Sequence, residues 1–425
     1  MTQTRRYLFL QGPHGPFFAG LARLLRAAGG QVWRVGVNGG DRAFWPDKDS
    51  YIPFDGTIED WPTRLRDLIE RHEITDLVLY GDTRPFHARA LDVARDKSLR
   101  IHVFEEGYLR PWWVSYERDG ANGHSRLMDK TVADMRAALD RLDLDQPDPP
   151  AHWGDMRQHI FYGALYHFHV LRGRKPGIAT HRDLPVWAEF RLHLTRLLKI
   201  PATALIRRIR TARIIGSGHP YHLCLLQLEH DASVTAHSSF ASMTAFIETV
   251  ITAFAEGAPR HHHLILKAHP LEDGRAPLAA HARNLTRQYG LTGRVHFLPG
   301  GKLAPLMDQA RSAVTINSTA AQQALWRGIP VKALGRAVYS KPEFVSEQPL
   351  AAFFADPQRP DARAYRDYRH YLLETSQIPG GFYAARGRRQ LLRQVVDMIL
   401  SDQDPYDHLD AGRPALRQRL KLVSG

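Results

Sequence analysis

Short apolar runs alternate along this chain with longer stretches whose apolar residues recur at helical spacing. Residues 7–10 form a first apolar run, and Phe17, Leu21 and Leu25 in the next stretch share one face of a helix. The same order recurs through the first quarter of the chain and again beyond its midpoint. Strands that alternate with helices in this way are typical of a parallel α/β fold. The expected strands are residues 7–10, 31–37, 77–80, 101–104, 223–228, 263–267, 295–298, 313–316 and 330–334, and the expected helices are residues 17–28, 61–72, 86–97, 242–255, 303–310 and 320–327.

The chain between the two α/β stretches has a different composition. It is helical in pattern, aromatic and strongly basic, with no acidic residue between Arg191 and Arg213. Arginines interleaved with leucines suit an anionic membrane surface or a solvated helix packed on the protein, and Pro201 interrupts any single long helix. We therefore expect four parts: a Rossmann-like domain in residues 1–125, a helical basic segment in residues 126–220 packed on it, a second Rossmann-like domain in residues 221–345, and a helical tail in residues 346–425 that crosses back to the first domain.

Composition narrows the classes of function. The 425 residues carry a formal net charge of +13, which favours an anionic partner: a nucleic acid, a membrane surface or a charged substrate. The basic stretch lacks a recognisable module for reading nucleic acid, so that partner is disfavoured. Cys224 is the single cysteine, which fits a reducing, cytoplasmic compartment. No apolar run reaches the ~20 residues of a membrane-spanning helix, and the N-terminal apolar run is too short for a signal peptide.

Two adjacent acids follow one of the predicted strands. Glu105 and Glu106 come directly after residues 101–104. Ligands of open α/β sheets bind just beyond the carboxyl ends of the strands. Two neighbouring carboxylates repel each other, which raises the pKa of one of them and suits it to proton transfer. The alternative interpretation is a turn with a helix-capping acid.

The second half carries two further strand-end motifs. His269-Pro270 follows the strand at residues 263–267, and the proline restricts the position of an imidazole that can contact a nucleotide phosphate. Ser318 and Thr319 open the helix expected at residues 320–327, where hydroxyl and N–H groups suit one phosphate or a simple helix cap. Neither half has a G-x-G-x-x-G fingerprint or a P-loop, which disfavours dinucleotide and nucleoside-triphosphate chemistry. This combination suits a nucleotide-sugar glycosyltransferase.

Four N-terminal motifs carry a resemblance to a known family. They are Gln11-Gly-Pro-His-Gly-Pro-Phe-Phe18, Asn38-Gly-Gly-Asp41, Gly81-Asp-Thr-Arg-Pro85 and Phe104-Glu-Glu-Gly-Tyr-Leu-Arg-Pro111. The chain resembles the single-module capsular-polysaccharide β-Kdo transferases of Gram-negative bacteria, densely over residues 7–125 and more loosely over residues 223–339. The resemblance implies a GT-B-like fold: two Rossmann-like parallel-sheet domains that face a cleft, the first for the acceptor and the second for the CMP-sugar, with a helical basic insertion. It also implies retaining transfer of Kdo from CMP-β-Kdo to a phosphatidylglycerol-type lipid, which initiates a poly-Kdo linker.

The resemblance further implies roles for individual residues. The segment Gln227-Leu-Glu-His-Asp231-Ala-Ser233 matches the family pattern Gln-x-x-x-Asp-x-Ser, which makes Asp231 the expected nucleophile and Glu229 the alternative. His230 departs from the acidic residue that several relatives have there. Glu106 is the expected acid/base, with Glu105 as its alternative, and His269 assists at the CMP phosphate. The expected donor-binding residues are Gln227, Lys267, His269, Pro270, Asn317, Ser318 and Thr319, and the expected acceptor-binding residues are Gln11, Gly12, His14, Gly15, Asn38, Asp41, Asp82, Arg84 and Arg110.

No metal or cofactor is expected beside the CMP-Kdo substrate, because a single phosphate needs no diphosphate-bridging ion. The Asp-x-Asp pairs, Asp47/Asp49, Asp143/Asp145 and Asp402/Asp404, follow none of the predicted strands and are interpreted as solvated loop acids. The His261-His262-His263 run lacks the i, i+4 spacing of a helical metal site.

The expected partners are the anionic lipid and the inner leaflet of the cytoplasmic membrane, with other capsule-assembly transferases and the export complex as further candidates. The expected location is cytoplasmic, peripheral to the inner membrane. Two alternatives remain: a non-catalytic sugar- or nucleotide-binding component of capsule export, and an inverting CMP-sialic-acid-like transferase that uses Glu106 without Asp231.

Overall fold

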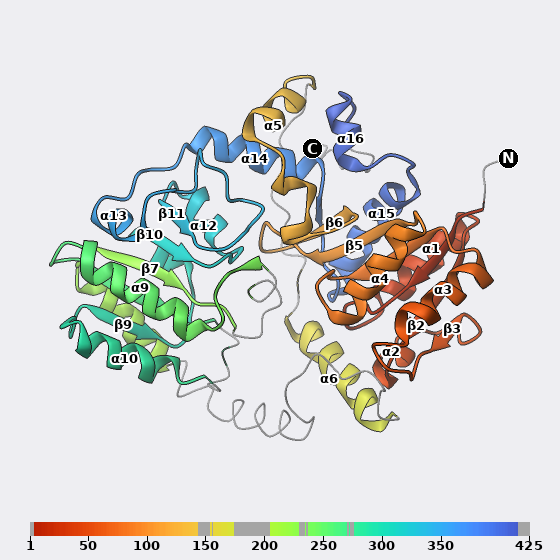
Figure 1. The fold of residues 1–425 in the computed structure, drawn as a ribbon, viewed down its shortest axis with the longest axis horizontal. Coiled ribbons are helices and arrows are strands. Elements are labelled where there is room, and N and C mark those ends of the chain that lie inside the picture. The colour runs from red at the N-terminus through yellow and green to blue at the C-terminus, as the bar shows by residue number, and fades with distance from the viewer. Residues whose placement is uncertain are drawn as a thin grey trace, which may run out of the picture. The chain divides into compact units, whose positions relative to one another are not determined.

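Strands and helices alternate in two separate units of the computed structural model (Figure 1). The first unit takes residues 1–126, 134–183 and 370–425, and the second takes residues 127–133 and 184–369. The structure describes residues 4–142, 154, 156–173, 205–228, 234, 237–269, 272 and 276–414.

The first unit is built on a seven-stranded sheet with the order β12-β6-β5-β4-β1-β2-β3. Five adjacent strands, from β3 to β5, are parallel, and β6 and β12 extend the sheet in antiparallel pairing. The strands are β1 (Arg6–Phe9), β2 (Gln31–Gly36), β3 (Tyr51–Pro53), β4 (Asp76–Tyr80), β5 (Arg100–Glu106), β6 (Trp113–Arg118) and β12 (Gln377–Pro379).

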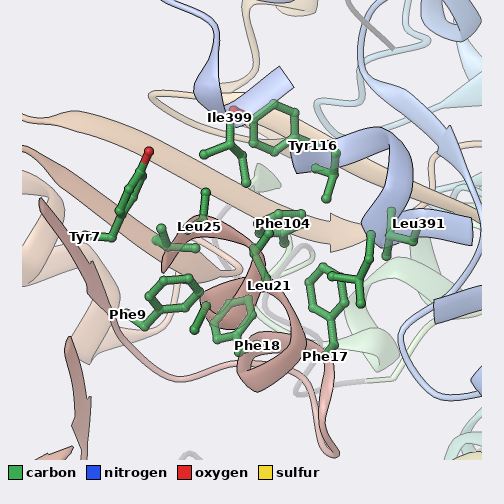
Figure 2. Packing of buried hydrophobic residues seen from close by; sticks show 14 of the residues in the cluster. Tyr7, Phe9, Phe17, Phe18, Leu21, Leu25, Phe104, Tyr116, Leu391 and Ile399 are labelled. Carbon is green, nitrogen blue, oxygen red and sulfur yellow. The ribbon is translucent and has the colours of Figure 1, made fainter. Parts of the chain in front are cut away.

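Helices cover both faces of this sheet because its strands are apolar on both sides. In β1, Tyr7 and Phe9 join one buried cluster, while Leu8 joins another on the opposite face. Figure 2 shows the first cluster, where side chains of α1 (Phe17–Ala27) and α15 (Ala385–Leu400) meet the sheet. The second cluster is closed by α3 (Trp61–His72) and α4 (Pro85–Asp96). Each large apolar side chain buried in this way contributes about 1.5–3 kcal/mol.

The second unit is built on five parallel strands in the order β11-β10-β7-β8-β9. Its core packs α9 against the sheet, and the Ser242 side chain accepts a hydrogen bond from Ala245 N (3.1 Å) to cap that helix. The strands are β7 (Tyr221–Leu225), β8 (His263–Lys267), β9 (Val295–Leu298), β10 (Ala310–Thr315) and β11 (Val331–Ala333), and the helices are α9 (Met243–Gly257), α10 (Leu278–Gln288), α11 (Ala304–Met307), α12 (Ala321–Trp326) and α13 (Leu350–Ala355).

Further helices complete the two units. They are α2 (Gly39–Ala43), η1 (Asn122–His124), η2 (Arg126–Met128), α5 (Val132–Leu139), α6 (Met156–Arg172), α14 (Ala362–Glu374) and α16 (Pro405–Asp410), and residues 205–216 are also helical. Among the helices that the structure describes, none combines the length and the apolar character needed to span a bilayer.

All nine expected strands and all six expected helices are present, with strand ends within three residues of those expected. The α/β class with two Rossmann-like parallel sheets is therefore confirmed. Three strands were not predicted: antiparallel β6 and β12, and the parallel edge strand β3. The middle segment was expected to pack on the first domain, but the helix at residues 205–216 belongs to the second unit and α6 to the first. In the tail, α13 lies in the second unit, whereas α15 and α16 lie in the first.

Candidate functional site

The carboxyl ends of β1, β4 and β5 bring one group of the predicted residues together. The strand order reverses between β1 and β4, since the chain builds β2 and β3 on one side and β5 on the other. Such a reversal is where open α/β sheets bind ligands. Gln11 follows β1, and its carbonyl accepts a hydrogen bond from Tyr80 N at the end of β4 (3.2 Å). Asp82 follows β4, and Glu106 ends β5.

Glu105 and Glu106 are the last two residues of β5 and do not form a loop, contrary to expectation. They pair with Ser115 and Val114 of β6, so the strand continues past Phe104. Successive side chains of a strand point to opposite faces of the sheet. The two carboxylates therefore have different surroundings, although they are adjacent in sequence.

Glu106 lies on the sheet face covered by α1 and α15. Its Oε1 accepts hydrogen bonds from the hydroxyls of Tyr80 and Tyr383, both at 3.4 Å. Burial, followed by the charge of Glu106, raises the pKa of both tyrosine hydroxyls, so they remain protonated donors. Neither tyrosine was predicted. Tyr80 is the polar end of a buried strand, and Tyr383 comes from the tail, with no local sequence signal that links it to β5.

Glu105 has the electrostatics of a proton-transfer group. Burial raises the pKa of its carboxyl to about 7; a hydrogen bond from Glu106 N opposes this rise, and the charge of Glu106 adds to it. The expected raised pKa is therefore present, but lost hydration contributes more than repulsion between the acids. Gly81 lets the backbone after β4 approach the Glu105 carboxylate closely, because its φ is +71° and an added Cβ would lie 3.2 Å from Glu105 Oε2.

Two cations and a buried acid flank these carboxylates. Arg84 and Arg110 both act to lower the pKa of Glu105; Arg84 lies over the Tyr80 ring at 5.4 Å, and exposed Arg110 donates to Gly107 O (3.2 Å). Asp82 Oδ2 accepts from Ala121 N (2.8 Å) and lies 3.1 Å from His124 Nδ1.

Asp41 is the centre of a second group of predicted acceptor residues. Its carboxylate accepts hydrogen bonds from Gln11 Nε2 (3.2 Å), Arg34 Nη2 (3.2 Å) and Val37 N (3.1 Å). Asn38 accepts from Asp41 N (3.0 Å) and caps α2. Tyr166 of α6, which was not predicted, donates to Asp41 Oδ1 (3.2 Å). The Asn38–Asp41 motif thus holds a helix from a distant part of the chain.

The predicted glycine motifs fit closely against α6. A Cβ added to Gly39 would lie 2.2 Å from His169 O, and one added to Gly40 would lie 2.6 Å from the Tyr166 ring. Gly15, with a φ of +97°, lies against the ring of Tyr162. The His14 ring is 4.7 Å from that of Tyr166. Gly12 instead packs against Phe18 within the first unit. The absence of side chains at Gly39 and Gly40 lets the helix approach the strand ends.

In the second unit the strand order reverses between β7 and β10, and two predicted donor residues meet there. Gln227 lies two residues beyond β7, and Asn317 lies two residues beyond β10. Gln227 Nε2 donates to Asn317 Oδ1 (2.9 Å), and Gln227 Oε1 accepts from Asn317 N (3.1 Å). This pair fixes the strand ends at the position where ligands of such sheets bind.

The other donor-side residues follow the same edge. Lys267 ends β8 and is buried, and burial and the charge of Arg207 lower the pKa of its ammonium group to about 8. Half-buried His269 follows two residues later. Ser318 and Thr319 precede α12, but neither is its N-cap: that residue is Ala320, and Ser318 Oγ accepts from Ala320 N (3.3 Å).

Several predicted residues lie outside the described part of the chain. They are Asp231, Glu229, Ser233, Pro270 and the Asp143/Asp145 pair. Among the described residues, no three His, Cys, Asp or Glu side chains are arranged to hold a metal ion. One loop acid differs from expectation, since Asp404 is buried, caps α16 and pairs with Arg126 (3.2 Å).

Sequence comparison with known proteins assigns the chain to a family. The profile of a family described as capsule polysaccharide biosynthesis protein matches residues 75–383, from β4 to Tyr383. The capsule polysaccharide export protein KpsS of Escherichia coli is 30% identical over 387 residues, which cover 89% of this chain and 97% of that protein. The capsule polysaccharide modification protein LipB of Neisseria meningitidis serogroup A is 31% identical and covers 89% and 91%.

Among solved structures, the β-Kdo 2,7-transferase KpsC of Thermosulfurimonas dismutans aligns with 91% of this chain and 98% of its own, at 12% identity and a TM-score of 0.46. Because that score is low, the fold assignment rests on the strand order given above. By the family profile and by identity to its relatives over nearly their whole length, this chain belongs to the capsule polysaccharide biosynthesis protein family.

Proposed function

We propose that this protein is a retaining glycosyltransferase that moves Kdo from CMP-β-Kdo to a phosphatidylglycerol-type lipid and so begins the poly-Kdo linker of a capsule. The observation that carries the proposal is the pair of strand-end acids in a member of this family, with Glu106 held by two tyrosine hydroxyls and Glu105 tuned to titrate near neutrality. A purely structural strand end has no need for both features. The Kdo donor and the lipid acceptor are inferred from the sequence motifs.

The proposed reaction has two displacements. Asp231 attacks the anomeric carbon of Kdo while the bond to the CMP phosphate breaks, which leaves Kdo on the enzyme. Glu106 then removes the proton of an acceptor hydroxyl, and that oxygen attacks the same carbon and releases Asp231. Two inversions give net retention. The role of Asp231 rests on the sequence pattern that begins at Gln227, because Asp231 lies outside the described residues.

Donor and acceptor are assigned to different units. In the second unit, Lys267, His269, Ser318 and Thr319 would contact the CMP phosphate from the carboxyl edge of the sheet, while the Gln227–Asn317 pair orders that edge. In the first unit, Arg84 and Arg110 are the cations that would meet an anionic lipid headgroup. A peripheral position at the inner membrane, metal-independent transfer, and contacts with other capsule-assembly proteins belong to the same proposal.

The test is to incubate the purified protein with CMP-Kdo and a short-chain phosphatidylglycerol and to weigh both the lipid and the intact protein. We expect the lipid to gain one Kdo. Asp231→Ala should abolish both the lipid product and any protein-bound Kdo. Glu106→Gln should slow formation of the lipid product by about 10²–10⁴-fold while protein-bound Kdo accumulates, because only the second displacement needs the base.

Other outcomes would favour the alternatives. A relative named as an export protein makes a non-catalytic component the second candidate. That role is favoured if the wild type binds CMP yet leaves every lipid unmodified. An inverting transferase is favoured if Asp231→Ala keeps its activity while Glu106→Gln loses it.

A further inference from the structure

Two helices gather most of the exposed apolar side chains of the described chain. Of ten large hydrophobic residues exposed there, seven lie on α6 or on the helix at residues 205–216, with exposed fractions between 44% and 62%. They are Ile160, Phe161, Phe168, Leu171, Leu205, Ile206 and Ile209. Several exposed apolar side chains on one helix indicate an interaction surface, unlike scattered single residues.

On α6 the exposed apolar residues share one face. Phe161, Phe168 and Leu171, with the exposed Ala164 between them, follow the spacing of three and four residues that aligns side chains on a helix. Ile160 lies beside Phe161 on the same side. We call these five residues the outer face of α6.

The inner face of α6 is fixed to the first unit. Tyr166 donates to Asp41, and Gln158 accepts from Ala385 N (2.9 Å). The His159 ring lies 4.0 Å from the ring of Tyr383, whose hydroxyl donates to Glu106. The helix therefore contacts both the Asn38–Asp41 motif and a hydrogen-bond partner of Glu106. Whatever the outer face binds is brought to that edge of the sheet.

The charge on each of these helices, taken by itself, favours an anionic partner. Residues 156–172 contain no Asp or Glu, and Arg157 and Arg172 stand exposed at the two ends of the outer face. Residues 205–216 also lack acidic residues and carry exposed Arg208, Arg210 and Arg213 beside Leu205 and Ile209. Phenylalanine and leucine flanked by arginine are characteristic of helices that lie in the interface of an anionic bilayer.

We propose that the outer face of α6 enters the interfacial layer of an anionic bilayer and holds the carboxyl edge of the first sheet at the lipid headgroups. This inference rests on the proposed function for its purpose, because a transferase that acts on a membrane lipid must hold its acceptor side there. To the proposed function it adds the structural element that contacts the membrane, which is α6. The arginines at its ends remain among the headgroups while the apolar side chains reach the upper acyl region.

The test uses the full chain and vesicles, without any sugar donor. Wild-type protein should sediment with vesicles of phosphatidylglycerol and phosphatidylcholine, and much less with phosphatidylcholine alone. The double variant Phe161→Glu/Phe168→Glu should lower the partition coefficient at least tenfold. A matched control, Tyr289→Glu/Trp326→Glu, changes two exposed aromatic residues at the carboxyl ends of α10 and α12 and should bind like the wild type. Circular dichroism and thermal unfolding check that each variant is folded.

The inference is overturned if the folded double variant binds vesicles as the wild type does, or if the wild type itself does not bind anionic vesicles. It is also overturned if gel filtration shows a wild-type dimer that Phe161→Glu/Phe168→Glu converts to a monomer, since a second copy then covers the face. Transfer to a short-chain lipid in free solution is measured separately. Its absence contradicts the proposed function and leaves the vesicle result standing.

Discussion

Glu105 and Glu106 have different surroundings, and we therefore expect them to have different chemical roles. Glu106 has two tyrosine hydroxyls as hydrogen-bond donors, which fix the direction of its carboxylate. Glu105 has a carboxyl whose pKa is about 7, raised first by burial. A group with that pKa populates both protonation states near neutral pH and can exchange a proton with an acceptor or with its neighbour.

The pH dependence of transfer should report on Glu105. If its ionised form is required, kcat/KM rises with pH and levels off above about 7, because the carboxyl is protonated below its pKa. In Glu105→Gln we expect that limb of the profile to disappear, whereas Tyr383→Phe should lower the rate and keep the limb. Rates of lipid product formation between pH 5.5 and 8.5 provide the measurement. A limb near pH 7 that persists in Glu105→Gln would assign it to another group.

At the scale of elements, the packing of α6 against the first unit depends on Gly39, whose role the sequence pattern alone does not explain. Alanine at Gly39 would place its Cβ 2.2 Å from His169 O, a backbone atom that moves only if the helix moves. We expect Gly39→Ala to cost about 1–3 kcal/mol and to speed hydrogen exchange in residues 156–173. Gly163→Ala is the matched control, since nothing lies within 4 Å of its Cβ and alanine favours a helix interior by about 0.5–1 kcal/mol. Equal exchange in both variants would contradict this packing.

A stack of histidines lies near the amino ends of β7, β8 and β9, and we expect it to make the second unit sensitive to acid. The His263 ring stacks on His219 (4.1 Å) and on His296 (5.2 Å), and its Nδ1 lies 2.9 Å from His296 Nε2. Burial, then the charges of the neighbouring histidines and Arg294, lower the pKa of His263 to about 4. An unfolded histidine takes up its proton near pH 6.5. The unfolded state therefore binds more protons between pH 6.5 and 4, and the free energy of unfolding falls as the pH falls through that window.

His263→Phe keeps a ring in this stack and removes the titrating group. Between pH 7.5 and 5.0 we expect the variant to lose about 1 kcal/mol less of its unfolding free energy than the wild type does, after allowance for the solvent that reaches the ring. Urea titrations at the two pH values measure this difference. Equal losses in both proteins would show that His263 is not responsible.

At the scale of the whole molecule, local sequence patterns predicted most of the helices and strands but fewer of the contacts between distant segments. Residues 101–104 have the alternation of a buried strand, so β5 was predictable. Its antiparallel neighbour β6 pairs in turn with β12, which comes from residues 377–379, and a pairing across that distance leaves no periodicity in either segment. For the same reason the acids and glycines at strand ends could be found, whereas Tyr166 and Tyr383 could not: their contacts with Asp41 and Glu106 exist only after distant segments pack together.

The proposed division between a donor unit and an acceptor unit predicts which residues CMP protects from hydrogen exchange. Saturating CMP should slow hydrogen exchange at residues 226–228, 267–269 and 316–321 of the second unit and leave residues 81–82 and 105–106 unchanged. A ligand at 100 times its Kd stabilises the state that binds it by about 2.7 kcal/mol, enough to detect by exchange mass spectrometry. Cytidine is the control: it lacks the phosphate and should protect residues 316–321 less than CMP does. Protection centred on Glu105 and Glu106 would instead place the donor on the first unit, and Arg84 and Arg110 would then become candidate phosphate ligands.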